Sequence, residues 1–373
     1  MVKKVLFCNN LLSGLLDFRG NVIRHFLDKG LEVVVVYIAA NDTEALKKLP
    51  EGVKHYAVQV SRTSRNPLND LRFMRELMKI MRRERPDYVF NYTIKPNIYG
   101  ALAAWLNRIP CTDMMAGLGY AFTNNSLSSK IARALYRFAL RHCRHLLLLN
   151  EANVETVKRM RICKAEKIIL LRGGEGVDLA HYAFSDNTSD DTVFLFIARL
   201  IEEKGYGDFV KAAEKVKQSF PQARFQVIGS YDLGYPKAIG KAQVERDVAA
   251  GTIEYLGVTS DMRAYYSRPG YVICIPSYYS EGLNRSLMEG CATGNPIITT
   301  DHPGCRETVE DGLNGYLVPV RQPDQLALAM RKYLLCSADE KAEMSRNSRR
   351  LAEKRFGVAE VIRVYDEIIA ALR

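Results

Sequence analysis

Short runs of almost uninterrupted apolar residues recur along the chain, and they constrain its fold more than any other feature. Strands of a parallel sheet that is covered on both faces have this continuous pattern, whereas half-exposed strands alternate. The runs span 3–10, 31–38, 86–93, 145–151, 192–200, 223–230, 252–258, 271–277, 295–301 and 315–320. Helical stretches separate most of them, and those we expect include 20–29, 69–85, 127–144, 206–219, 283–292 and 323–335. This order predicts an α/β fold with two doubly wound, Rossmann-like domains.

The polar segment 185–191 (SDNTSDD) interrupts this pattern and is the best candidate for a linker. We therefore expect an N-terminal domain over 1–184 and a C-terminal domain over 185–356. A terminal helix over 357–373 has no strand after it and is expected to return to the N-terminal domain. Ligands bind at the carboxyl ends of parallel strands, so we expect the two domains to face each other across a cleft that holds the site.

Composition and charge narrow the class of protein. Hydrophobic residues make up 47% and charged residues 25% of the 373 residues, which is typical of a globular protein. No apolar run reaches the ~18 residues of a membrane span, and the N-terminus lacks the pattern of a signal peptide. The eight cysteines include no Cys-x-x-Cys pair, which favours reduced thiols in a cytosolic protein over a metal or redox site.

The positive charge is concentrated in the first half of the chain. Residues 1–172 contain 29 Lys and Arg against 14 Asp and Glu, whereas residues 173–373 contain 24 against 28. A basic half predicts an anionic partner. We expect no nucleic acid, because no nucleic-acid-binding signature accompanies the charge.

Two glutamates flank a strand-to-helix junction in 276–290 (PSYYSEGLNRSLMEG). Glu281 follows the carboxyl end of an expected strand, and Glu289 lies eight helical residues further on, a span of ~12 Å. Arg199 and Lys204 follow the strand 192–200, and such a cation pair suits a diphosphate. The backbone N–H groups of 282–284 (Gly282, Leu283 and Asn284) open a helix and suit phosphate or sugar oxygens. The alternatives are a dipole-complementing acid, a solvated helical glutamate and an ordinary charged loop.

These residues, together with 294–318 (GNPIITTDHPGCRETVEDGLNGYLV), resemble the retaining nucleotide-sugar glycosyltransferases of family 4. That family has the glycosyltransferase-B (GT-B) fold of two Rossmann-like domains. In the first half, 9–20, 61–71, 92–104, 116–122 and 148–155 resemble bacterial enzymes that extend undecaprenyl-diphosphate-linked saccharides, of the N-acetylgalactosaminyltransferase type. The resemblance departs from the family at Asn284-Arg285, where many relatives carry proline, and at Lys95, where many carry histidine.

The resemblance assigns roles to residues of this chain. Arg199 and Lys204 would bind the donor diphosphate, Glu281 the donor sugar near the reacting face, and Glu289 the ribose, so the catalytic set is Glu281, Arg199 and Lys204. The donor would also contact 282–284 and Gly14, which we place in a loop after the first strand. Acceptor candidates are Arg19, Arg62, Asn66, Lys95 and Gly117. We expect no metal and no cofactor besides the nucleotide sugar, because the chain has no Asp-x-Asp pair and no convincing histidine ligand set.

The segment 127–146 contains a cationic stripe and an apolar stripe at helical spacing and no acidic residue. The cations are Lys130, Arg133, Arg137, Arg141 and Arg144. Such a helix is typical of a segment that lies on an anionic membrane, although an ordinary surface helix packed on its sheet is the alternative. We therefore expect a cytoplasmic enzyme that associates peripherally with the inner face of the cell membrane.

The combined prediction is a metal-independent, retaining transferase. It would move galactose or N-acetylgalactosamine from a UDP-sugar to a polyprenyl-diphosphate-linked saccharide during surface glycan synthesis. The alternatives are a UDP-sugar epimerase of the same architecture and an inactive glycan-binding scaffold.

Overall fold

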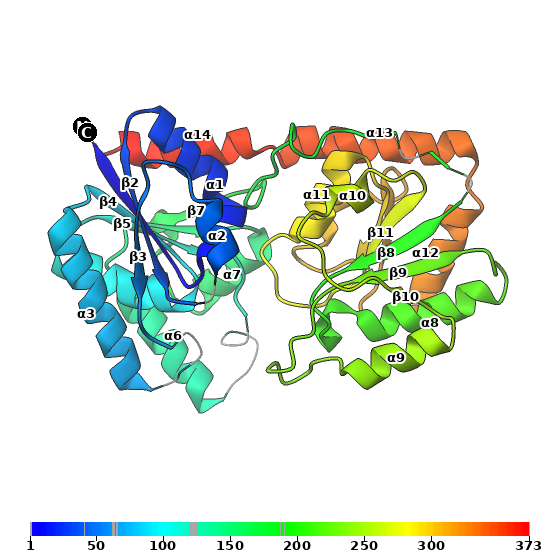
Figure 1. Cartoon of the computed structure of the whole chain (residues 1–373), viewed down its shortest axis with the longest axis horizontal. Helices are drawn as coiled ribbons and strands as arrows, with labels where there is room; N and C mark the ends of the chain where they lie inside the picture. Colours follow the sequence, from blue (N-terminus) through cyan, green and yellow to red (C-terminus); the bar gives the residue numbers. More distant parts are fainter. Residues whose placement is uncertain are drawn as a thin grey trace. The chain divides into compact units, whose positions relative to one another are not determined.

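The computed structural model describes residues 2–40, 42–61, 64, 66–119, 122, 126–186, 188–189 and 191–372. The chain forms two compact units, each with its own sheet (Figure 1). Unit 1 comprises Met1–Gly176 and Val358–Arg373, and unit 2 comprises Val177–Gly357. The two doubly wound domains predicted from the apolar runs are therefore present.

Unit 1 contains a seven-stranded sheet in the order β3-β2-β1-β4-β5-β6-β7, with every pair parallel. The strands are β1 (Lys4–Asn9), β2 (Glu32–Ile38), β3 (Lys54–Val58), β4 (Tyr88–Tyr92), β5 (Cys111–Met115), β6 (His145–Leu148) and β7 (Ile168–Leu170). Phe7 of β1 pairs with Val35 on one side and Phe90 on the other. β4 is buried along its whole length and matches a predicted apolar run, whereas β5 is equally buried but contains Thr112 and Asp113 and was missed, as were the edge strands β3 and β7.

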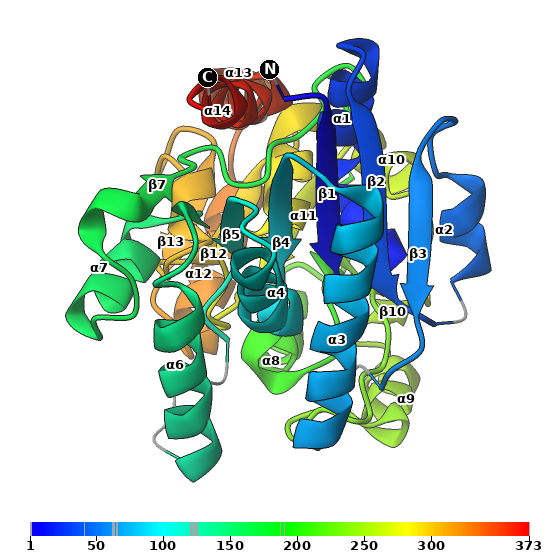
Figure 2. The ribbon, with the colours of Figure 1, turned by 90° about the vertical axis from the view of Figure 1, so that its left-hand side faces the viewer.

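The helices of unit 1 cover both faces of this sheet (Figure 2). They are α1 (Leu12–Asp28), α2 (Thr43–Lys47), α3 (Pro67–Glu84), the π-helical turn η1 (Pro96–Gly100), α4 (Ala101–Leu106), α6 (Leu127–Ala139), α7 (Glu151–Arg159), the 3-10 turn η2 (Ala165–Lys167) and α14 (Val358–Ala370). Side chains of α1 and α14 pack on one face, and those of α3, α4, α6 and α7 pack on the other.

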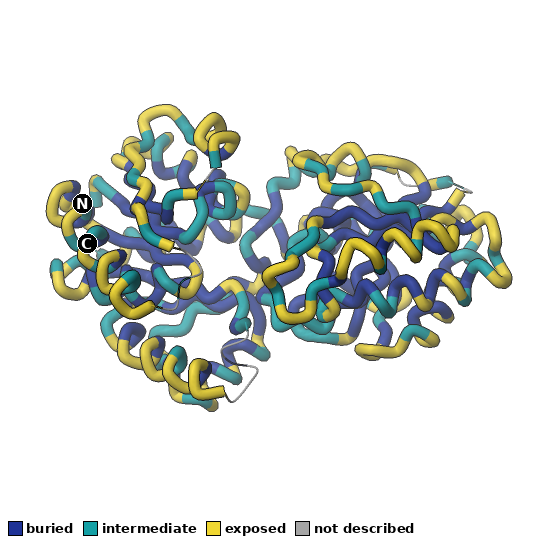
Figure 3. Tube along the Cα trace, turned by 60° about the horizontal axis from the view of Figure 1, so that its bottom comes forward, coloured by how far each residue is buried: buried dark blue, intermediate teal, exposed yellow. Residues whose placement is uncertain are grey.

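Unit 2 repeats this plan with six parallel strands in the order β10-β9-β8-β11-β12-β13. The strands are β8 (Val193–Ile197), β9 (Arg224–Ile228), β10 (Glu254–Tyr255), β11 (Tyr271–Ile275), β12 (Ile297–Thr300) and β13 (Gly315–Val318). The helices are η3 (Glu202–Lys204), α8 (Tyr206–Lys217), α9 (Lys241–Ala249), α10 (Arg263–Tyr266), α11 (Arg285–Thr293), η4 (Arg306–Thr308), α12 (Pro323–Leu334) and α13 (Ala338–Arg355). Figure 3 shows the central strands of each unit as buried and the outer helix faces as exposed, whereas the edge strands β3, β7 and β10 are only partly buried.

The boundary between the two units lies earlier in the chain than the polar segment 185–191 suggested. The division falls after Gly176, because the residues that follow pack on unit 2. The Val177 N–H donates to the Phe356 carbonyl at 2.6 Å, and the Phe184 ring lies against Gly294. The terminal helix α14 belongs to unit 1, where Tyr365 is fully buried and its hydroxyl lies 2.9 Å from that of Tyr92.

The prediction for the first helix was wrong at its start. α1 begins at Leu12, not near residue 20, so Gly14 lies in its first turn and not in a loop. Leu12, Leu15 and Val22 recur at helical spacing and are buried against the sheet, and this packing outweighs the low helix propensity of glycine.

The eight cysteines are free thiols, and six of them are buried. Among the helices in the described ranges, none is both long enough and apolar enough to cross a membrane.

Candidate functional site

Two loops meet at the carboxyl edge of the sheet in unit 2. One follows β8 and the other follows β11, which are neighbouring strands. Gly205 has φ +85°, and a Cβ there would lie 2.2 Å from the Pro276 carbonyl oxygen, so no larger residue fits between the loops. The Tyr278 N–H also donates to the Glu203 carbonyl at 2.8 Å. The backbone thus fixes the two loops against each other.

This arrangement brings Lys204 and Glu281 into an ion pair. Lys204 Nζ lies 2.8 Å from Glu281 Oε1, and both side chains are 12% exposed. The same oxygen accepts hydrogen bonds from Ser277 Oγ and Asn284 Nδ2, each at 3.0 Å. A carboxylate with three donors on one oxygen is held in a single orientation. The junction identified in the sequence is therefore a preorganised polar cluster, and Glu281 does more than complement a helix dipole.

Arg199 lies in the same loop but is oriented by the loop after β9. Its Nη1 lies 2.7 Å from Asp232 Oδ2, and its guanidinium stands over the rings of Tyr279 and Tyr235. Lys204 Nζ also lies 5.2 Å from the centre of the Tyr279 ring. Arg199 is 42% exposed, so its guanidinium keeps access to solvent. Tyr279 therefore lies beside both predicted diphosphate-binding cations.

Sequence reasoning missed Asp232, Tyr279 and Ser277. Asp232 follows β9, which adjoins β8 in the sheet, and the strand order was needed to connect it with Arg199. Tyr279 and Ser277 lie inside the stretch that contains Glu281, but nothing in their spacing distinguishes a site residue from a loop residue. The position of Asp232 after the carboxyl end of a strand was the one available signal.

The helix after Glu281 begins two residues later than expected. α11 starts at Arg285, and Asn284 is its N-cap, accepting a hydrogen bond from the Leu287 N–H at 3.2 Å. The Asn284 N–H donates to the Gly304 carbonyl at 2.7 Å. Leu283 is buried in the core of unit 2, and Gly282 lies between it and Glu281. Asn284 therefore orients Glu281 through its amide and starts α11 through its carbonyl oxygen.

Glu289 lies within α11 and is buried, so it is not the solvated helix residue that was one alternative. Its Oε1 lies 2.6 Å from Arg285 Nε, and its Oε2 accepts a hydrogen bond from the Tyr266 hydroxyl at 3.3 Å. A buried carboxylate needs such partners to remain charged. Arg285, where the chain departs from the family, supplies the countercharge.

Unit 1 places the predicted acceptor residues in different environments. Arg19 is 1% exposed, and its Nη2 lies 2.6 Å from Glu175 Oε1. Its guanidinium also stands over the Tyr92 ring at 4.9 Å. Arg19 is therefore buried and paired within unit 1, and its contact with an acceptor stays a prediction. Gly14 lies in the first turn of α1, where a Cβ would make an ordinary van der Waals contact with Asn9 Nδ2 at 3.8 Å.

Two of the other acceptor candidates, Asn66 and Lys95, contact the segment before α3. Arg62 lies outside the described residues. Lys95 Nζ lies 2.8 Å from Asp70 Oδ1 and donates to the carbonyls of Ser61 and Ser64. Asn66 caps α3 by accepting from the Leu68 N–H at 2.9 Å. Lys95 and Asn66 thus have structural contacts of their own, whereas Gly117 lies in the loop that follows β5.

The predicted membrane helix contains both stripes, and both reach solvent. α6 buries Ser129, Tyr136 and Ala139 only, whereas its apolar stripe is exposed. The exposed fractions of that stripe are 74% for Leu127, 53% for Ile131, 37% for Leu135 and 48% for Phe138. Two of the five cations are fixed by hydrogen bonds to the backbone. Arg137 donates to the carbonyls of Met160 and Arg161, and Arg144 donates to that of Ala371. The helix therefore packs on the sheet through Tyr136 and Ala139, as the alternative expected, while the stripe named in the sequence reaches solvent.

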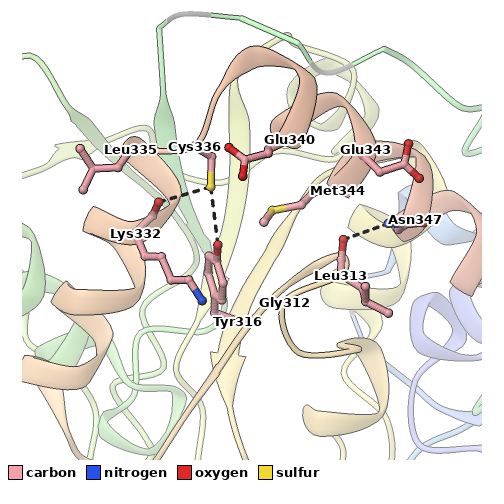
Figure 4. Close-up of a pocket in the computed structure, with 10 residues that line it drawn as sticks. All are labelled: Gly312, Leu313, Tyr316, Lys332, Leu335, Cys336, Glu340, Glu343, Met344 and Asn347. Atoms are coloured by element: carbon pink, nitrogen blue, oxygen red, sulfur yellow. Dashed lines mark hydrogen bonds between the residues drawn. The ribbon is translucent and has the colours of Figure 1, made fainter.

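Within the described residues, no group of three or more His, Cys, Asp or Glu side chains is arranged to hold a metal ion. A cavity of about 460 Å³ lies between α12, α13 and β13 (Figure 4). Its Tyr316 hydroxyl lies 3.6 Å from Cys336 Sγ. The cavity opens beside the first residues of β13, at the amino edge of the sheet, and so lies away from Lys204 and Glu281.

Comparison with known proteins agrees with the fold. Residues 182–351 match the family "Glycosyl transferases group 1", and residues 20–179 match "Glycosyltransferase Family 4". A glycosyltransferase from Rickettsia africae superposes with a TM-score of 0.80 at 18% identity over 98% of this chain and 97% of that one. The Anabaena protein HepE, solved with UDP and glucose, superposes at 0.79 with 18% identity over 99% and 100% of the two chains. The chain is a glycosyltransferase of the GT-B type and belongs to these families.

Two curated relatives are similar over most of their length. The first is the N,N'-diacetylbacillosaminyl-diphospho-undecaprenol alpha-1,3-N-acetylgalactosaminyltransferase of Campylobacter jejuni, 25% identical over 92% of this chain and 91% of that protein. The second is the UDP-Gal:alpha-D-GlcNAc-diphosphoundecaprenol alpha-1,3-galactosyltransferase of Escherichia coli, 23% identical over 76% and 75% of the two chains. The resemblance found in the sequence is thereby confirmed.

Proposed function

We propose that this glycosyltransferase moves a hexose or N-acetylhexosamine from a UDP-sugar to a polyprenyl-diphosphate-linked saccharide in bacterial surface glycan synthesis. The names of the two curated relatives support the class of acceptor, and the name of the Escherichia coli relative supports UDP as the nucleotide. Galactose and N-acetylgalactosamine are the first donors to test. The proposal rests most on one observation: a lysine and a glutamate, paired at 2.8 Å, stand at the carboxyl edge of the second sheet.

The proposed mechanism follows from the negative charge that develops on the leaving group when the glycosidic bond of the nucleotide sugar is cleaved. Cleavage of the bond between the anomeric carbon and the phosphate oxygen leaves a highly negative nucleoside diphosphate. Lys204 and Arg199 would stabilise that charge, with no metal required, because fixed cations act strongly in a partly desolvated site. Glu281, held by Ser277 and Asn284, would bind hydroxyls of the donor sugar. Glu289 would bind the ribose after its carboxylate shifts from Arg285.

We propose that the configuration at the anomeric carbon is retained because the acceptor attacks the same face of the sugar from which the phosphate leaves. The acceptor hydroxyl oxygen forms a bond to the anomeric carbon on the face from which the phosphate departs, and its proton passes to a leaving phosphate oxygen. UDP and the extended saccharide are the products. In this scheme Glu281 stays a carboxylate throughout, and the ammonium of Lys204 remains within its reach. A covalent intermediate on Glu281 is the less favoured route.

The test is release of UDP from a panel of UDP-sugars, measured with and without a synthetic polyprenyl-diphosphate saccharide and in the presence of EDTA. A transferase releases UDP when the acceptor is added, an epimerase converts the sugar without it, and a scaffold does neither. We expect acceptor-dependent release that EDTA does not abolish and that Glu281→Ala abolishes. Inversion at the anomeric carbon, seen by NMR of the product, would overturn the retaining mechanism.

We also propose that unit 1 docks peripherally on the inner face of the cell membrane through α6. The exposed stripe of Leu127, Ile131, Leu135 and Phe138 offers apolar area, and the adjacent cations complement anionic lipids. Replacing Arg133, Arg137 and Arg141 with Ser should weaken sedimentation with anionic vesicles. Equal sedimentation of the wild type and this variant would contradict the docking role.

A further inference from the structure

Unit 1 contains a second cavity, larger than the one in unit 2 and different in chemistry. It measures about 910 Å³ and lies between the C-terminal end of α6 and the segment 158–167 that joins α7 to β7. Seven of its twelve lining residues are Lys or Arg, and none is acidic. Because β6 and β7 begin beside it, the cavity lies at the amino edge of the sheet, opposite the carboxyl edge where an acceptor would be expected.

The positive charge of this cavity is almost unopposed within the part of the chain that the structure describes. Lys164 pairs with Glu166 at 3.4 Å, and both side chains are more than 70% exposed, so the pair contributes little. Arg137 donates to the carbonyls of Arg161 and Met160, and Lys167 to those of Arg141 and Cys143, which orients these cations without cancelling their charge. Like charges held this close repel one another unless an anion joins them.

The remaining lining is apolar and indicates what kind of anion fits. Leu140, Met160 and Ile162 contribute apolar surface beside the cations. A free phosphate would use the cations alone, whereas a lipid headgroup with its glycerol and first methylene groups would use both surfaces. Arginine forks and lysine point charges are the usual partners of a phosphate group.

The helix that lines the cavity also carries the exposed apolar stripe. Phe138 lies next to Arg137 in sequence, and its ring meets that of His142 at 5.5 Å. The His142 ring stacks in turn on Trp105 at 4.0 Å, and Trp105 is 47% exposed. Tryptophan and phenylalanine at such a position favour the membrane interface, at the level of the headgroups. A cavity beside them would meet lipid phosphates.

We propose that this cavity binds the phosphate of an anionic phospholipid headgroup and so fixes one lipid against α6. The inference deepens the docking role proposed above and rests on it. The cavity would bind one phospholipid per protein molecule, in addition to the nonspecific electrostatic attraction between the basic surface and an anionic membrane. It would also set the rotation of α6 about its own axis on the membrane.

The test uses dihexanoyl phosphatidylglycerol below its micelle concentration, with the full chain in an isothermal titration. The cavity variant is Lys158→Gln with Lys164→Gln, and its matched control is Lys47→Gln with Lys48→Gln, at the opposite edge of the sheet. We expect the wild type to bind this lipid saturably. The cavity variant should raise the Kd by about 30-fold, because each of its two lost basic residues contributes ~1 kcal/mol. The control variant should have the Kd of the wild type. Arg141→Gln, from the other wall of the cavity, should weaken it as well.

Three results would overturn the proposal. One is equal affinity of the wild type and the cavity variant. Another is equal affinity for dihexanoyl phosphatidylcholine, which carries no net charge. The third is equally tight binding of inorganic phosphate, which would identify a free-phosphate site. The cavity variant should keep acceptor-dependent UDP release with a water-soluble acceptor. If no variant or wild type releases UDP, the proposed function fails while the lipid result stands.

Discussion

At the scale of single residues, the site in unit 2 depends on one carboxylate oxygen that three donors share. Lys204, Ser277 and Asn284 all contact Glu281 Oε1, and they come from two different loops. Removing the ammonium would release Glu281 from one side and would remove a cation from the leaving group. The same residue thus serves both orientation and charge stabilisation in the proposed mechanism.

We predict that Lys204→Ala lowers kcat/KM for UDP release by about 100-fold or more, the effect of losing one electrostatic stabiliser of a transition state. Lys211→Ala is the matched control, because Lys211 is an exposed lysine of the adjoining helix α8. Initial-rate measurements with saturating acceptor decide the matter. A tenfold or smaller change in Lys204→Ala would show that Arg199 alone carries the charge.

A second residue-scale prediction concerns pH. Asp113 of β5 is fully buried, and burial raises the pKa of its carboxyl well above the ordinary value, while the hydrogen bond from Asn91 Nδ2 at 2.8 Å lowers it in part. The folded state therefore holds this proton at pH values where the unfolded chain has lost it. The free energy of unfolding must fall as pH rises from the unfolded-state pKa of ~4 toward the folded-state pKa.

Asp113→Asn removes that titration and keeps the size of the side chain. We expect the melting temperature of this variant to exceed that of the wild type at pH 8 and the difference to shrink toward pH 5. Thermal unfolding in matched buffers measures it. A difference that grows toward acid pH would mean that Asp113 is ionised in the folded protein.

At the scale of elements, ten strands were predictable because burial on both faces leaves a continuous apolar run, whereas the largely exposed β3, the polar-containing β5 and the short β7 were missed. The ten runs named from the sequence correspond to strands that include β1, β2, β8 and β11. The start of α1 was not predictable, because Gly14 and Gly20 interrupt its first turns and the packing that overrides them is tertiary.

The site residues also fall into those that could be predicted from the sequence and those that could not. Glu281 and Lys204 were predictable from motif spacing, and the structure brings them together. Asp232 was not, because its proximity to Arg199 depends on the order of β9 and β8 in the sheet. The ion pair of Arg19 was not predictable either, because a cation in a helix near a loop gives no sign in the sequence that Glu175 lies 156 positions later to receive it. Buried ion pairs between distant residues are a property of the fold.

The element-scale prediction concerns α6. Trp105 is the single tryptophan of the sequence and lies beside Phe138 through His142, so its fluorescence reports on this surface. We expect a blue shift of its emission when vesicles containing phosphatidylglycerol are added. Ile131→Ser with Phe138→Ser should weaken vesicle binding by at least about tenfold, since each side chain loses apolar burial.

The matched control for this pair is Leu328→Ser with Leu335→Ser, two exposed leucines of unit 2. This control should bind vesicles as the wild type does. Equal loss in both pairs would indicate nonspecific adhesion of apolar side chains. An unchanged emission spectrum in the wild type would contradict docking through this surface.

At the scale of the whole molecule, all the proposed donor contacts except Gly14 lie in unit 2, whereas Tyr365 of α14 completes the core of unit 1. We therefore predict that UDP still raises the melting temperature in Tyr365→Ala, although the variant is less stable by about 3 kcal/mol or more. At 100 times its Kd, UDP should stabilise the wild type by ~2.7 kcal/mol. Thermal shift measurements compare the two increments.

Glu360→Ala, an exposed change on the same helix, is the control for the Tyr365 variant. It should melt as the wild type does and respond equally to UDP. Loss of the UDP increment in Tyr365→Ala, with the increment kept in the control, would mean that nucleotide binding depends on the core of unit 1.

The path of the chain between the two units has a consequence for synthesis. Unit 1 begins with the first described strand but is completed by Val358–Arg373, so its core lacks Val361, Tyr365 and Ile368 until these residues have been synthesised. Unit 2 is contiguous in sequence and can finish first. The usual order of folding on the ribosome, N-terminal part before C-terminal part, is therefore reversed here. A nascent chain stalled before residue 358 would carry an incomplete unit 1 whose exposed apolar surface favours aggregation.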